Sequence, residues 1–218
     1  HTETRELFSV SSQHYAFVVN AFVSLLKRAD MTRYELFLRE TRTYEIIEDV
    51  KNFRSEIGVL FLNSYNRDVL TKMFDDNRLT YTSLFKARPH IFVSKSNPLA
   101  KHEVVSLEDL EDFPYLSYDQ GIHNSFYYSE EILSQIPHKK SIVVSDRATL
   151  FNLLIGLDGY TIATGILNSN LNGDNIVSIP LDIDDEIDIV YLKHEKATLS
   201  KMGEKFLDNL VKEVTFDN

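Results

Sequence analysis

A repeated unit constrains the fold of this chain more than any other feature: an apolar strand ends in polar residues, and a helical segment follows directly. The first copy is residues 7–13 (LFSVSSQ), which lead into a helix-like segment at 14–27. The second is a strand at 34–38, followed by a polar turn and a helix at 44–50. A later copy is the strand 141–144, which reaches an apolar helix through Ser145 and Asp146. Strands that alternate with helices in this way predict an α/β fold with mostly parallel sheets.

The polar residues after each strand predict where a ligand would bind. Residues 56–62 (EIGVLFL) form an almost continuous apolar run that ends at Asn63, as expected of a parallel strand buried on both faces. In open parallel sheets, ligands bind outside the carboxyl ends of the strands, so these polar loops should cluster at one rim. Helix starts at this rim would offer unpaired amides and a dipole that favour an anion or a carboxylate.

The hydroxyl groups in these turns have two interpretations. Ser11 and Ser12 could cap the helix that follows them or bind a ligand, and Thr43 is a plausible N-cap of the second helix. We expect binding for Ser12 and Gln13. For Ser11 the capping interpretation stays open beside it.

Two long extended stretches predict a division into two lobes. Residues 82–96 are extended throughout but contain Pro89, which interrupts strand pairing, and the stretch is too long for one ordinary strand. We interpret it as a crossing between lobes, with residues 187–192 as the return. The predicted lobe I is 1–85 with 185–218, which ends in a single-faced helix, and lobe II is 86–184.

Composition excludes several classes of function. The chain has 218 residues, a formal net charge of −10 and no Cys. The charge argues against a direct nucleic-acid surface, and the lack of Cys excludes disulfides, thiolate metal sites and thiol redox switching within this chain. Residues 1–6 lack the apolar core of a secretory signal, and no apolar run approaches the roughly 20 residues of a membrane span. A cytoplasmic location is the expectation.

The segment 15–26 is apolar on nearly every side of a helical wheel. A helix that merely covers a sheet needs only one apolar stripe. Its second face should therefore be covered, either by another part of the chain or by a second copy of it.

Sequence motifs give little support to an enzyme. No Gly-x-Ser-x-Gly elbow, His-Glu-x-x-His pair, Gly-x-Gly-x-x-Gly or phosphate-binding Lys loop occurs. His14 could contact a ligand, although a surface or capping role is favoured. The acidic run 182–186 is interpreted as a solvated loop because it lacks the spacing of a calcium site. No metal, cofactor or catalytic residue is predicted.

One longer stretch carries a family resemblance. Residues 91–100 (IFVSKSNPLA) followed by 105–110 (VSLEDL) resemble the effector-binding domain of LysR-type transcriptional regulators. Further matches in register lie at 56–58, 144–146 and 159–163, so the resemblance covers essentially the whole chain. One departure is Thr164-Gly165, where the family usually has a Pro.

The resemblance implies a two-lobed fold like that of type 2 periplasmic binding proteins, in which each lobe has a mixed, mostly parallel sheet flanked by helices. It also implies a small effector in the interlobe cleft, two crossing strands, and a helix-turn-helix DNA-binding domain before residue 1. The expected effector-binding residues follow the strand ends: Ser11, Ser12, Gln13, Thr41, Thr43, Asn63, Tyr118, Gly121, Ser145 and Asp146.

Family members pair through the first-lobe helix of one copy and the terminal helix of another. The resemblance therefore favours a second copy, rather than the same chain, as the cover of segment 15–26. The expected interface residues of a homodimer or homotetramer are Phe17, Val18, Phe22, Leu25, Leu207 and Leu210.

The predicted function is effector sensing: a small metabolite, anionic or amino-acid-like, binds in the interlobe cleft and controls transcription by the full-length protein. The alternative is a solute-binding protein of a transporter, which would have the same architecture. An upstream helix-turn-helix would support the regulator, and a signal peptide with a lipidation Cys would support the transporter.

Overall fold

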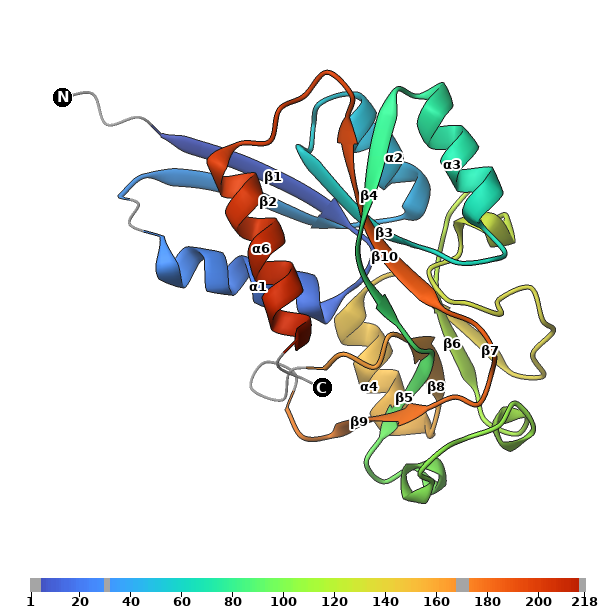
Figure 1. Ribbon diagram of the computed structural model, residues 1–218. Coiled ribbons are helices and arrows are strands. Elements are labelled where there is room, and N and C mark those ends of the chain that lie inside the picture. Colours follow the sequence, from blue (N-terminus) through green and yellow to red (C-terminus); the bar gives the residue numbers. More distant parts are fainter. Residues whose placement is uncertain (1–4, 30–31, 168–172, 216–218) are drawn as a thin grey trace.

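The computed structural model describes residues 5–29, 32–167 and 173–215 and contains two five-stranded mixed sheets flanked by helices (Figure 1). We call each sheet with its helices a lobe. The α/β class predicted from the repeated unit is confirmed. No helix in the described ranges has the length and apolar character needed to cross a membrane.

Lobe I has the strand order β2-β1-β3-β10-β4. Strand β1 is parallel to β2 and β3, whereas β10 is antiparallel to β3 and β4. The strands are β1 (Glu6–Ser12), β2 (Tyr34–Glu40), β3 (Ile57–Leu62), β4 (Leu79–Ala87) and β10 (Ile187–His194), and the helices are α1 (Ala16–Arg28), α2 (Thr43–Lys51), α3 (Arg67–Asp76) and α6 (Lys201–Thr215).

Lobe II repeats this plan with the order β7-β6-β8-β5-β9. Strand β6 is parallel to β7 and β8, and β5 is antiparallel to β8 and β9. The strands are β5 (His90–Ser94), β6 (Tyr115–Tyr118), β7 (Ser141–Val144), β8 (Tyr160–Ala163) and β9 (Ile176–Pro180). The helices are α4 (Arg147–Leu157) and the short 3-10 helices η1 (Pro98–Lys101), η2 (Glu108–Leu110) and η3 (Phe126–Tyr128).

The chain passes between the lobes twice. It leaves β4 at Ala87 and enters β5 at His90, and it returns between Pro180 and Ile187. The extended stretch predicted around 82–96 is thus two strands separated at Pro89, which has no amide to donate to a ladder. The lobe boundaries at 85 and 185 stay a prediction.

Strand β3 is buried along its whole length because helices cover both faces of its sheet. Alternate residues point to opposite faces. Ile57, Val59 and Phe61 pack in the cluster that contains α1 and α6, whereas Leu60 and Leu62 pack against α2 and α3. A nearly continuous apolar run is the sequence pattern that such double burial requires.

Helix α1 is covered by α6 of the same chain, which lies beside it in Figure 1. The rings of Phe8, Phe22 and Phe206 lie 5.7–6.0 Å apart, centroid to centroid. The six side chains expected at a dimer interface are all buried within the chain: Phe17, Val18, Phe22, Leu25, Leu207 and Leu210. Because α6 of the same chain covers the apolar face of α1, that face gives no reason to expect a second copy. Pairing of two chains through α1 and α6 stays a prediction that rests on the family resemblance alone.

Two capping interpretations were wrong, and one helix was missed. Helix α1 begins at Ala16 with Tyr15 as its N-cap, so neither Ser11 nor Ser12 caps it. The N-cap of α2 is Arg42, and Thr43 is the first helical residue. Helix α3 was not predicted at all, although Leu70, Met73 and Phe74 have the three- and four-residue spacing of one helix face.

Candidate functional site

The two lobes meet where β1, β2, β6 and β7 end. These strands lie at the opposite edge of each sheet from the strands that carry the crossings. Many contacts join the lobes there, and we call four groups of them the interlobe latch: His14 with Glu130, Glu40 with Arg147, Arg42 with Asp119, and Thr43 with Gln120 and Tyr128.

His14 and Glu130 form the most buried ion pair of the latch, with side chains only 6% and 3% exposed. The backbone amide of His14 donates to Glu130 Oε1 at 2.8 Å, and His14 Nδ1 lies 2.8 Å from the same oxygen. Burial alone would lower the pKa of His14, but its hydrogen bond to Glu130 and the charges of Glu130 and Glu40 raise that pKa above the ordinary value. The His14 ring also stacks on Tyr118, with 4.0 Å between centroids.

Two arginine contacts flank this pair. Arg147 Nε donates to Glu40 Oε1 at 2.7 Å, with side chains 21% and 24% exposed. Arg42 and Asp119 lie further out: Arg42 Nη2 donates to Asp119 Oδ2 at 2.8 Å, and both side chains are more than 40% exposed. Exposed ion pairs contribute about 0–1 kcal/mol, so the Arg147 pair holds the lobes together more strongly.

Thr43 is the hydrogen-bonding centre of the latch. Its hydroxyl accepts from Gln13 Nε2 at 2.8 Å and donates to the carbonyl oxygen of Tyr128 at 2.7 Å. Its amide donates to Gln120 Oε1 at 3.1 Å. Because Thr43 begins α2, this amide has no partner within the helix, and Gln120 from the other lobe supplies one.

An interlobe cavity lies beside the latch. Its walls are largely apolar and come from both lobes: Phe17, Phe61 and Ile187 from lobe I, and Phe92, Leu150, Phe151, Ile162 and Ile166 from lobe II. Its free volume is about 50 Å³. Small-molecule sites measure roughly 300–1,000 Å³, so the lobes are closed on one another here and must separate to admit an ordinary ligand.

The polar part of the cavity wall consists of His14, Tyr15, Glu130, Glu131, Arg147 and two threonines. Glu131 differs from the other charged groups because, within the described part of the chain, no Lys, Arg or His side chain forms an ion pair with it. Its Oε1 accepts from the amide of Tyr118 at 2.9 Å. Burial raises the pKa of Glu131 well above its usual range, and the charge of Glu130 raises it further. The cavity thus contains a buried carboxyl group that no cation among the described residues compensates.

The three residues at the end of β1 are buried and hydrogen-bonded within lobe I. Ser11 Oγ donates to Asp49 Oδ2 at 2.6 Å and lies 2.7 Å from Ser55 Oγ, so its hydroxyl ties β1 to α2. Ser12 Oγ donates to the carbonyl oxygen of Gln13. The amide group of Gln13 bonds Thr43, Phe61 and Tyr15. With the lobes closed, Ser11, Ser12 and Gln13 support the latch and do not line the cavity.

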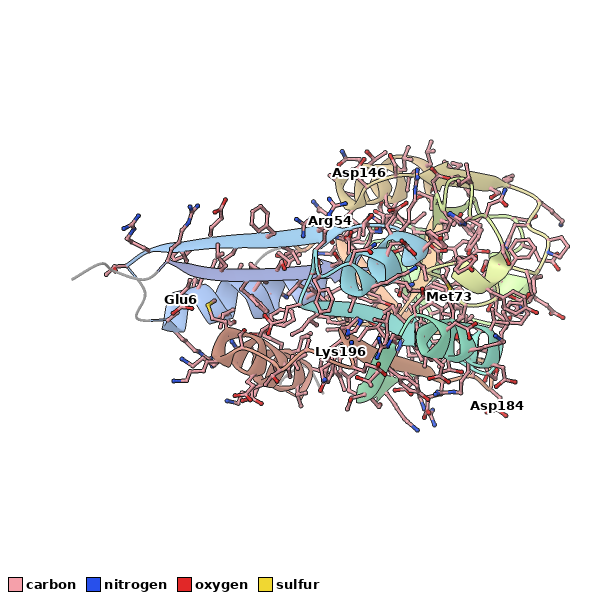
Figure 2. The ribbon with its side chains drawn as sticks, turned by 90° about the horizontal axis from the view of Figure 1, so that it is seen from above. Glu6, Arg54, Met73, Asp146, Asp184 and Lys196 are labelled. Atoms are coloured by element: carbon pink, nitrogen blue, oxygen red, sulfur yellow. The ribbon has the colours of Figure 1, made fainter. Side chains whose placement is uncertain are left out.

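The other expected residues are dispersed around the rim. Asn63 accepts from the amides of Tyr65 and Asn66, and Thr41 donates its amide to Ser12. Asp146 caps α4 by accepting from Thr149, is exposed like Ser145, and lies at the periphery of the molecule in Figure 2. Of the ten expected residues, Tyr118 alone contributes to the described walls of the interlobe cavity. The binding roles of all ten stay predictions.

Sequence reasoning missed Glu130, Glu131 and Arg147. The two acids follow η3 in a segment without helical or strand periodicity, so nothing in the sequence marked them as buried. Arg147 directly follows the expected Asp146 and was passed over. Thr164, at the position where the chain departs from the family pattern, lines the cavity although no Pro is present there.

The NPLA motif has a structural role in lobe II. Asn97 caps η1 by accepting from the amide of Leu99 at 2.9 Å, and its Nδ2 donates to the carbonyl oxygen of Asp158 at 3.0 Å. Across residues 5–29, 32–167 and 173–215, no three His, Asp or Glu side chains are grouped so as to hold a metal ion.

Comparisons with known proteins agree with this architecture. The reduced regulatory domain of OxyR from Pseudomonas aeruginosa superposes with a TM-score of 0.67 at 12% identity, over 97% of this chain and 100% of that one. The BenM effector-binding domain with its effector benzoate gives 0.63 at 16% identity, over 97% and 93%. The QuiR effector-binding domain in complex with shikimate gives 0.61 at 15%, over 96% and 97%. Comparison with curated protein sequences gave no significant match.

The family assignment rests on a profile match that spans nearly the whole chain. The LysR substrate binding domain profile matches residues 12–215, which include all of lobe II, both crossings, and lobe I from the last residue of β1 onward. The two mixed sheets have the type 2 periplasmic-binding-like fold of these domains. The chain therefore belongs to the LysR substrate-binding domain family, the effector-binding domains of LysR-type transcriptional regulators.

Proposed function

We propose that this chain is the effector-sensing domain of a LysR-type transcriptional regulator and that its effector binds in the interlobe cavity. The observation that carries the proposal is the cavity itself, which is walled by both lobes and bordered by a latch that only closure completes. Such a ligand changes the angle between the lobes because it binds one arrangement better than the other. Transcription would then be controlled through the DNA-binding part of the full-length protein.

The effector class that fits the walls is amino-acid-like, with an apolar side chain. A simple anion, the other class expected from the sequence, would face Glu130 and Glu131 at the polar end. An ammonium group beside Glu131 would compensate the one carboxyl group that lacks a cation partner. Arg147, at the same end, could receive a carboxylate, while the phenylalanine and isoleucine walls would enclose the side chain.

A ligand that binds near the latch would couple its binding to the angle between the lobes, as a sensor requires. Shifting a two-state equilibrium from 1:99 to 99:1 takes a ligand preference of about 10⁴-fold for one state. A buried ion pair with Glu131 forms only when both lobes enclose the ligand, so its free energy favours closure alone. The ligand would therefore bind more tightly when the lobes enclose it than when they are apart.

The wider setting is also a proposal. We propose a cytoplasmic homodimer or homotetramer that contacts DNA through a domain outside this chain. The transporter alternative is less well supported because the profile match is to regulator domains. Structures with benzoate and shikimate show that domains of this fold hold small effectors, which supports a binding rather than a catalytic role.

Calorimetry with three matched ligands tests the effector class. L-leucine is compared with 4-methylpentanoate, which lacks the ammonium group, and with isopentylamine, which lacks the carboxylate. We expect leucine and isopentylamine to bind more tightly than 4-methylpentanoate. The preference should disappear in Glu131→Gln and persist in Glu45→Gln, a charge-matched control on the exposed side of α2.

Proton release gives a second readout. Because the pKa of Glu131 is raised, an ammonium group that ionises this carboxyl should release a proton, which titrations in buffers of different ionisation enthalpy would detect. Tighter binding of 4-methylpentanoate would contradict the amino-acid-like class. Unchanged binding in a folded Ala163→Phe variant, in which the new ring fills the cavity, would place the site elsewhere.

A further inference from the structure

Lobe II contains a second cavity, whose described walls share only Ile162 with the interlobe cavity. It lies between η2, strand β8 and the segment 133–139, and its free volume is about 220 Å³. An engineered apolar cavity of roughly 150 Å³ in another protein holds benzene, so this one has room for a single ring with a substituent. Its apolar walls are Leu107, Leu110, Phe113, Leu133, Ile136 and Ile162.

One wall of this cavity is polar and only partly satisfied. The Tyr160 hydroxyl lies 3.2 Å from His138 Nδ1, and both residues line the cavity. His138 stacks on Tyr115 with 3.8 Å between centroids and an interplanar angle of 11°. His138 Nε2 is buried without a hydrogen-bond partner in the described structure. Buried polar atoms rarely lack partners, because leaving them unpaired costs free energy.

The polar wall is uncharged at neutral pH. Burial lowers the pKa of His138, so its imidazole is neutral and offers one donor and one acceptor nitrogen. Burial also raises the pKa of Tyr160 to about 12, so its hydroxyl stays protonated. At the mouth, Lys139 pairs with Glu111 at 3.4 Å, which leaves no unpaired cation there to attract an anion. A neutral ligand that both donates and accepts a hydrogen bond matches this wall.

The backbone of the cavity wall is also unusual. Leu133 has φ 61°, in the left-handed region that residues other than Gly seldom adopt. Such a conformation persists only where the surrounding structure enforces it, and it is frequent at binding sites. The segment that contains Leu133 is therefore held in a defined shape around the cavity.

We propose that this cavity is a second small-molecule site, and that it takes a neutral single-ring aromatic alcohol of the phenol class. The ring would lie against Leu110, Leu133 and Ile162. The hydroxyl group would bond His138 Nε2, donating or accepting according to the tautomer that Tyr160 selects. This site does not depend on the proposed effector.

Nuclear magnetic resonance titration with phenol and toluene tests the site. The two probes share size and shape, but only phenol has a hydroxyl group. Both should shift the backbone amides of Leu110, Leu133 and Tyr160 in a saturable way, and phenol should bind roughly fivefold more tightly, the effect of one ordinary hydrogen bond. In the double variant His138→Phe/Tyr160→Phe, which keeps the rings and removes both polar groups of this wall, phenol and toluene should bind equally.

A second variant covers the case in which the double variant does not fold. Ile136 is 40% exposed at the mouth, so Ile136→Trp should leave the core intact while blocking entry, and neither probe should then shift these amides. Three results would overturn the proposal: equal binding of the two probes by the unsubstituted chain, retained binding in Ile136→Trp, or shifts confined to the amides of Phe17, Phe61 and Phe151 around the interlobe cavity.

Discussion

Replacing Thr43 by Val tests whether the latch holds the lobes as described. The substitution keeps the shape of the side chain and removes only the hydroxyl, which accepts from Gln13 and donates to Tyr128. Gln13 is 1% exposed, so its Nε2 would stay buried without that acceptor, at a cost of about 1–3 kcal/mol. Tyr128 is partly exposed, so water can replace its partner and the loss there is about 1 kcal/mol.

These contributions sum to about 2–4 kcal/mol of unfolding free energy. For a chain of this length, 1 kcal/mol changes Tm by about 2–4 °C, so Thr43→Val should lower Tm by roughly 9 °C. Thr43→Ser is the matched control, because it keeps the hydroxyl and loses one methyl group, which costs about 1 kcal/mol.

Differential scanning calorimetry of the three proteins in one buffer measures the difference. We expect the order unsubstituted chain, Thr43→Ser, Thr43→Val, with a clear gap between the last two. If Thr43→Val were as stable as Thr43→Ser, the hydroxyl would contribute only about 1 kcal/mol, as much as the methyl group, instead of about 2–4 kcal/mol, and the central contact of the latch would be wrong.

The remaining predictions concern the core, the buried acid and two glycines. Phe22→Ala should lower the free energy of unfolding by about 3–5 kcal/mol at every protein concentration, because Phe22 packs on Phe8 and Phe206 of its own chain. A loss of stability seen only in dilute solution would instead indicate an interface between chains. Leu7→Ala, at a 63% exposed site, is the control. Raised pKa values of Glu131 and His14 mean that the folded chain retains protons that the unfolded chain has lost, so stability should fall as pH rises above 4.5 for Glu131 and above 6.5 for His14. Tm of Glu131→Gln, measured from about pH 5 to about pH 8, should fall less than that of the unsubstituted chain, and an identical fall would refute the burial of a titrating carboxyl group. Gly121→Ala should lower the free energy of unfolding by about 1 kcal/mol or more, because Gly121 has φ +63° and a Cβ there would lie 2.5 Å from Arg42 Nη1. Gly156→Ala, in α4 with nothing within 4 Å of the added Cβ, should instead stabilise the chain by up to about 1 kcal/mol. Equal unfolding temperatures for the two variants would contradict both predictions.

The sequence predicted the architecture well, because strand burial leaves a direct trace in composition. The run at 56–62 had to be a strand with two covered faces, and Pro89 had to interrupt the crossing. Helix α3 left a weaker trace, since only Leu70 and Phe74 are fully buried in it, with Met73 partly buried beside them.

The site was harder to predict because its side chains are positioned by distant partners. Ser11 bonds Asp49, 38 residues away, and this contact decides that its hydroxyl is structural. Glu130 and Glu131 are buried by residues from both lobes, which no local periodicity reveals. The strand ends predicted ten residues, of which Tyr118 alone contributes to the described cavity walls, and the charged groups in those walls are brought together only by tertiary packing.

The two crossings have a mechanical consequence. A body tethered at two points can swing about the line that joins them, and the displacement of each atom grows with its distance from that line. Ile187, which follows the return crossing directly, would hardly move, whereas Thr43, Arg147 and their partners at the opposite sheet edges would travel furthest. The latch thus acts at the end of the longest lever arm, where a few hydrogen bonds exert the greatest torque on the angle between the lobes.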